Sequence, residues 1–105
     1  MAAGLGLLLL FASSSALANC YELIGCTDSD CFQAAQLNQI SCELLWEVRN
    51  TIYKERGYCF HTQKAIDFFS NVNCQYNDVG LVPLNDAERY NVAAIKKVEA
   101  SKGCP

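Results

Sequence analysis

Apolar residues recur every three or four positions in three stretches of the chain, and this spacing predicts three amphipathic helices. The clearest stretch covers residues 42–56, a shorter one covers 63–70, and the third follows Asn85 and ends at Gly103. The predicted inward faces are formed by Leu45, Val48 and Ile52, by Ala65, Ile66 and Phe69, and by Ala87, Ala94, Ile95 and Val98. The pattern therefore predicts an all-α core built between helices.

Residues that favour helix ends flank each of these stretches. The candidate N-caps are Ser41, Thr62 and Asn85, and the candidate stops are Gly57 and Gly103. Asn85 is followed three residues later by Glu88, the spacing of a reciprocal capping box. Residues 74–84 contain Gly, Pro, Asn and Asp and predict a loop.

The segment before the first helix is less regular. A short extended piece is expected at 21–24, and a short helix over 31–37 with Asp28 or Ser29 as its cap. The expected fold class is a small three- to four-helix disulfide-stapled domain with an irregular Cys-rich N-terminal segment.

The first 18 residues have the pattern of a secretory signal peptide. A short apolar run at 5–11 is followed by small residues, and Ala16-Leu17-Ala18 suits a signal peptidase. The run is too short to span a bilayer, so no transmembrane helix is expected. Residues 1–4 contain no Lys or Arg, which a start upstream of Met1 would explain. We therefore expect a signal peptide over 1–18 and a single domain over 19–105.

Charge and cysteine content narrow the possible classes of protein. The formal net charge is −3, which argues against a nucleic-acid binder and against a polybasic lipid anchor. All 7 cysteines follow residue 18, and an exported chain meets an oxidising compartment. Disulfides are therefore expected, and the odd number leaves one cysteine over.

A layout of three antiparallel helices limits the possible pairs. The first helix spans about 21 Å, whereas bridged Cα atoms lie within roughly 7 Å, so Cys42 and Cys59 at its two ends do not pair. If each helix runs back along the previous one, Cys42 meets Cys74 and Cys59 meets Cys104. We predict these two disulfides.

Three cysteines near the N-terminus then compete for one bridge. The favoured pair is Cys20–Cys26, with Cys31 as a free thiol that could link two copies of the chain, and Cys20–Cys31 remains open. A further alternative is a lipoprotein, because Leu17-Ala18-Asn19-Cys20 superficially resembles a lipoprotein cleavage box. Asn19 argues against this, since the position before the cysteine favours Gly, Ala or Ser.

One stretch resembles a known family. Tyr53-Lys54-Glu55-Arg56-Gly57 is similar to the Tyr-Ala-Arg-His-Gly motif that names the YARHG family of presumed extracellular bacterial domains. Family-like residues precede it at Arg49-Asn50 and Ile52 and follow it at Tyr58 and Phe60. Phe68-Phe69 and a closing pattern with Leu84-Asn85-Asp86-Ala87-Glu88, Asn91, Ile95-Lys96 and Glu99 extend the resemblance over about 40–102.

The resemblance implies an exported, small helical domain, found alone or attached to peptidases and signalling proteins. It implies no known reaction or ligand. The motif His is replaced by Arg56, so no role of that His can be carried over. The cysteines look like those of small Cys-rich members from alphaproteobacteria, which points to the periplasm.

The candidate binding residues are few. Arg49 and Tyr53 lie one helical turn apart, and with Arg56 and Tyr58 they form a candidate binding face, although such residues more often serve packing. No catalytic set is expected: His61 is the only histidine, so Cys31 and His61 are the only conceivable Cys–His pair. Cys59-x-His61 lacks a second zinc-ligand pair, so no metal or cofactor is expected.

The sequence therefore favours an exported non-enzymatic domain, a binding or accessory module of the cell envelope. The alternative is a small secreted enzyme or enzyme inhibitor on a disulfide scaffold, since stapled small scaffolds host both.

Overall fold

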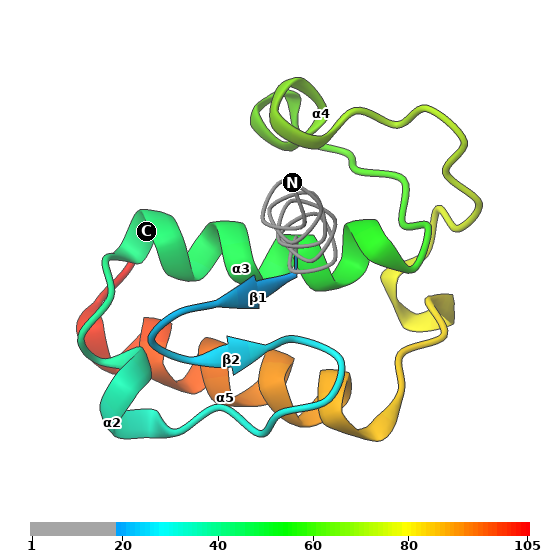
Figure 1. Ribbon diagram of the computed structural model, residues 1–105. Coiled ribbons are helices and arrows are strands. Elements are labelled where there is room, and N and C mark those ends of the chain that lie inside the picture. Colours follow the sequence, from blue (N-terminus) through cyan, green and yellow to red (C-terminus); the bar gives the residue numbers. More distant parts are fainter. Residues whose placement is uncertain (1–18) are drawn as a thin grey trace, which may run out of the picture.

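The computed structural model describes residues 19–105 and shows a mostly helical, disulfide-rich domain (Figure 1). The elements are β1 (Cys20–Tyr21), β2 (Gly25–Cys26), α2 (Ala34–Leu37), α3 (Cys42–Glu55), α4 (Gln63–Phe69), the short 3₁₀ helix η1 (Val79–Leu81) and α5 (Asp86–Lys102). The four helices and the very small two-stranded sheet confirm the predicted fold class. The predicted signal peptide over 1–18 lies outside the described residues.

Helices α3 and α5 are antiparallel neighbours that form the centre of the domain (Figure 1). Arg56 pairs with Glu88 at one end of the two helices, and Arg49 pairs with Glu99 toward the other. The predicted apolar faces meet between them, and the fully buried side chains there include Leu45, Val48, Ile52 and Ile95. The core thus follows the helical periodicity of the sequence.

The predicted caps of α3, α4 and α5 are present, whereas neither Asp28 nor Ser29 caps α2. The side chains of Ser41 and Thr62 accept hydrogen bonds from the backbone N–H groups of Leu44 and Ala65. Asn85 and Glu88 form the reciprocal capping box of α5. Gly103, in the left-handed conformation with φ 70°, ends α5 as expected.

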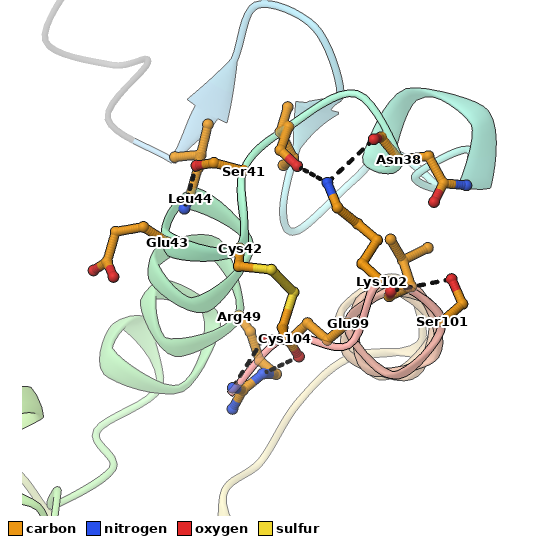
Figure 2. Close-up of a disulfide and its surroundings, with 12 residues drawn as sticks. Asn38, Ser41, Cys42, Glu43, Leu44, Arg49, Glu99, Ser101, Lys102 and Cys104 are labelled. Carbon is orange, nitrogen blue, oxygen red and sulfur yellow. Dashed lines mark hydrogen bonds and ion pairs between the residues drawn. A yellow bond between two sulfur atoms is a disulfide. The ribbon is translucent and has the colours of Figure 1, made fainter.

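Figure 2 shows how the far end of α5 is fastened. The Cys42–Cys104 disulfide joins the first residue of α3 to the chain just after α5, with the Cα atoms 5.5 Å apart. The ammonium group of Lys102 donates to the carbonyls of Asn38 and Ile40 in the connection between α2 and α3. Two segments far apart in sequence, 38–42 and 102–104, therefore meet at one end of the domain.

The chain leaves the central pair after α3 and returns to the same place after α4. Helix α4 packs near the start of α3, where Lys64 pairs with Glu43 and Phe68 contacts Trp46. The long Lys54 side chain reaches from the last turn of α3 to the carbonyl of Ser70, just after α4. An extended segment must therefore run back along α3 before α4 begins. The two ends of this excursion meet at a bridge between Tyr58 and Tyr76.

This path corrects two predicted disulfides. Cys59 pairs with Cys74, at a Cα separation of 5.1 Å, and Cys42 pairs with Cys104, so the predictions Cys42–Cys74 and Cys59–Cys104 were wrong. The predictions assumed that the second helix itself runs back toward the start of the first. The extended segment makes that return instead, so Cys74 comes back beside Cys59.

The N-terminal segment forms a small hairpin and then packs on α5. Cys20 is joined to Cys26 across the antiparallel pair β1 and β2, which is the pair the sequence favoured. A thiol used in this disulfide cannot carry a lipid, which argues against the lipoprotein alternative. Helix α2 starts three residues later than predicted, and its N-cap Gln33 makes no side-chain capping bond.

Buried Asn91 attaches this segment to α5. Its side-chain carbonyl accepts from the N–H of Phe32 at 2.8 Å, and its amide donates to the carbonyls of Thr27 and Asp30 at 3.0 and 2.7 Å. The carbonyl oxygen and both N–H bonds of the Asn91 side chain are thus used in hydrogen bonds to the backbone of this irregular segment. Within residues 19–105, no helix is long and apolar enough to cross a membrane.

Candidate functional site

The four candidate binding residues belong to the contact between α3, α5 and the motif turn. Arg49 makes a two-pronged ion pair with Glu99, with N···O distances of 2.8 and 3.2 Å (Figure 2). Tyr53 is buried, and this burial raises its pKa although nearby Arg49 acts in the opposite direction. Tyr58 is half-buried, with its ring packed between those of Tyr53 and Phe60.

Arg56 is different because a buried carboxylate binds its guanidinium while part of the side chain stays exposed to solvent. Its Nε lies 2.9 Å from both carboxylate oxygens of Glu88, which is almost completely buried. This hydrogen bond raises the pKa of Arg56, with smaller contributions from the charges of Glu88, Asp28 and Glu55. The Arg56 side chain is still 37% exposed. The four residues therefore do not form one exposed cluster, and Arg56 is the one whose charged group reaches a concave surface.

The family motif ends in a tight turn that defines this surface. Gly57 has φ +92°, a backbone conformation that residues other than glycine rarely adopt. Its carbonyl accepts from the N–H groups of Gln75 and Tyr76 at 2.7 and 3.0 Å, and Tyr76 in turn accepts from the N–H of Cys59 at 2.7 Å. The turn is thereby fixed against the returning strand of the α4 excursion.

A hollow of about 470 Å³ lies beside this turn, and we call it the motif hollow. It is lined by Lys54, Glu55, Arg56, Gly57, Val72, Asn73, Gln75, Tyr76 and Pro83. Sequence reasoning identified Arg56 but missed the others, because residues 72–76 and 83 reach the turn only through the path of the excursion. The one available signal was the charged run Lys54-Glu55-Arg56 next to a helix-ending glycine.

A second groove lies between α2 and α5. Its volume is about 420 Å³, and its lining is mostly apolar: Phe32, Ala34, Asn38, Tyr90, Ala93, Ala94, Lys97, Val98 and Ser101. It contains no paired charges and none of the family-motif residues. Of these two hollows, the motif hollow is therefore the one lined by charged groups of both signs.

Cys31 and His61 make separate contacts. Cys31 is exposed and is the cysteine without a disulfide partner among residues 19–105. The Nε2 atom of His61 lies 2.7 Å from the carbonyl of Asn77, and its ring packs against Tyr58. The hydrogen bond of His61 thus goes to a loop carbonyl and not to the Cys31 thiol. In the described part of the chain, no three His, Cys, Asp or Glu side chains gather as metal ligands.

Comparison with known proteins agrees with the motif. A search of the curated proteins and a search of the solved structures found no similar protein. The YARHG domain family matches residues 19–100, so the match includes the N-terminal hairpin as well as the helical core seen in the sequence. This small, disulfide-rich helical chain belongs to the YARHG domain family, a family of extracellular-type domains.

Proposed function

We propose that this chain is an exported, non-enzymatic binding module of the cell envelope, and that its binding site is the motif hollow. The observation on which the proposal rests is the state of Arg56. Buried Glu88 holds the guanidinium through Nε, and its two Nη groups make no hydrogen bond to any of residues 19–105. A fixed charged group with unused donors at a concave surface is suited to bind a polar ligand.

Export is supported from two directions. The family match begins at Asn19, the residue that follows the predicted cleavage site. Asn19 already belongs to the fold, since its carbonyl accepts from the N–H of Thr27 at 3.0 Å and its side-chain amide donates to the Thr27 hydroxyl. Three disulfides within one small domain also fit an oxidising compartment. A mature chain starting at Asn19 in the periplasm is the form we propose.

The other polar residues of the family pattern argue against catalysis because they are already used to hold the fold together. Arg49 pairs with Glu99, and Asn91 holds the 27–32 segment. These groups have structural partners that a reacting substrate would have to displace.

The test is retention of an envelope component by residues 19–105, oxidised and immobilised. We expect periplasmic or envelope fractions to yield one component that is retained by the native protein. Because the site contains Arg56, the Arg56→Lys variant should lose most of this retention while keeping its disulfides.

Lys96→Gln is the matched control, because Lys96 is exposed on α5 and lines neither hollow. It should bind as the native protein does. Equal retention by native protein and Arg56→Lys, or no retained component in any fraction, would contradict the proposal.

We also propose that the exposed Cys31 thiol can join two copies of the chain. Non-reducing mass spectrometry of protein oxidised at high concentration should show a dimer that Cys31→Ser abolishes. A protein that stays monomeric under these conditions would contradict the link.

A further inference from the structure

We infer that the motif hollow binds the C-terminal end of a peptide, with the carboxylate on Arg56 and Lys54 and the adjoining amide N–H on Glu55. This inference rests on the proposed function and names the ligand class of the same site. It follows from three features of the hollow: a fixed guanidinium, a mixed set of charges and an apolar wall.

The guanidinium is fixed by a chain of hydrogen bonds that starts in the backbone. Glu88 accepts from the N–H of Asn85 at 2.8 Å, and its own N–H donates to the Asn85 side chain at 2.8 Å. The carboxylate so fixed accepts from Nε of Arg56 at 2.9 Å. The two Nη groups then present the planar fork that matches two carboxylate oxygens.

Lys54 provides a second donor at the same hollow. Its ammonium group donates to the carbonyl of Ser70 at 2.9 Å, which holds it in place and uses one of its three N–H bonds. The remaining donors make no hydrogen bond within residues 19–105, and Lys54 lines the same hollow as Arg56. Lys54 lies in the last turn of α3 and Arg56 is the C-cap of that helix, so both residues line the hollow from the same helix end.

The acidic groups around the hollow select the kind of anion. Glu55 lines the hollow, Glu88 lies behind Arg56, and the charge of Asp28 also acts on Arg56. These carboxylates repel a doubly charged phosphate about twice as strongly as a singly charged carboxylate, which can still bind both Nη groups of Arg56. Glu55 can accept one hydrogen bond, which the amide N–H next to a peptide's terminal carboxylate can donate.

An apolar wall suits the last side chain of such a peptide. Val72 is 72% exposed, and it lines the hollow together with Pro83 and the ring of Tyr76. An aliphatic side chain at the end of the peptide would cover Val72. Binding would thereby remove apolar surface from water, which is favourable. The three features together suit a ligand that carries an amide N–H, a carboxylate and an aliphatic side chain close to one another.

The probe is the dipeptide acetyl-Ala-Val, titrated at low salt into residues 19–105 labelled with ¹⁵N. We expect saturable shifts of the backbone signals of Lys54, Gly57 and Gln75. The same peptide with a C-terminal amide, which lacks the carboxylate, should bind at least about tenfold more weakly. Inorganic phosphate and acetate should both bind more weakly than the peptide.

Variants separate the site from the fold. Lys54→Gln should weaken binding several-fold and Arg56→Lys about tenfold or more, while Lys96→Gln should leave it unchanged. If Arg56→Lys fails to fold, the Lys54→Gln variant and the amide-capped peptide still test whether the carboxylate binds in the motif hollow. Equal binding of the two peptides, tighter binding of phosphate, or shifts confined to other residues would overturn the inference. In that event an envelope component still retained by the native protein and lost in Arg56→Lys would leave the proposed function standing with another ligand.

Discussion

At the scale of single residues, the polar side chains of the family pattern are mainly structural. Glu88 completes a capping box and holds Arg56, and Glu99 holds Arg49. The caps were predictable because a cap depends on a few neighbouring residues. The role of Asn91 was not, because its partners are backbone groups of an irregular segment that gives no periodic signal.

Buried Tyr53 and half-buried Tyr21 predict a loss of stability in alkaline solution. Burial raises the pKa values of Tyr21 and Tyr53 above their ordinary value of 10.0. The folded protein thus holds these protons more tightly than the unfolded chain does. This contribution to stability is fully present below pH 10 and is lost as the pH rises through 10 toward the higher folded pKa values.

The measurement is the free energy of unfolding by guanidinium chloride between pH 8 and about pH 11. Tyr53→Phe should flatten part of the decline and change little at pH 7. The Cys31→Ser background prevents thiolate exchange from mimicking the effect. A decline of the same size in Tyr53→Phe would assign it to other groups.

At the scale of elements, the sequence predicted the helices but not the connection between α3 and α4. The periodicity of apolar residues shows which side of a helix faces inward. It does not show the direction in which α4 runs, because that depends on the path of the connection between α3 and α4. That direction is set by the extended return after Gly57 and by hydrogen bonds between the Asn71 side chain and the backbone of Phe60. Because the motif hollow forms only where this excursion closes, most of its lining could not be predicted either.

The side chain of Asn91 makes three hydrogen bonds between α5 and the N-terminal segment. Asn91→Ala should lower the free energy of unfolding by about 2–4 kcal/mol, since it removes three hydrogen bonds to backbone groups, two of them buried. Hydrogen exchange should show lost protection at residues 27–32 before the rest of the domain. Asn38→Ala is the matched control, because its amide makes an exposed bond to its own helix, and it should cost well under about 1 kcal/mol. Similar losses in the two variants would show that Asn91 has no special role.

At the scale of the whole molecule, the disulfides are three separate constraints of different length. They join cysteines 6, 62 and 15 residues apart in Cys20–Cys26, Cys42–Cys104 and Cys59–Cys74. The oxidised, stapled character of the domain could be predicted from cysteine content and the signal-like segment. The two long pairings could not, because they depend on the path of α4.

The three bridges should differ in what they contribute to stability. Loop-closure entropy predicts losses of about 4, 3 and 2 kcal/mol on replacing Cys42–Cys104, Cys59–Cys74 and Cys20–Cys26 by paired alanines. Guanidinium unfolding of the three double variants, each with Cys31→Ser, measures the order. Peptide mapping that joined Cys42 to Cys74 would contradict the fold, and an inverted order of losses would contradict the entropic explanation.

The two larger rings also differ in when they can close. If the chain is exported N-terminus first, as proposed above, Cys59 and Cys74 emerge before Cys104, and their ring encloses the α4 excursion alone. Cys104 follows every other cysteine, so the sulfur of Cys42 must wait for nearly the whole domain to emerge. During that delay Cys42 shares the new compartment with Cys31, a thiol that has no final partner among the described residues. Correct disulfide formation therefore requires α5 to dock on α3, which brings Cys104 to Cys42, faster than Cys42 reacts with Cys31.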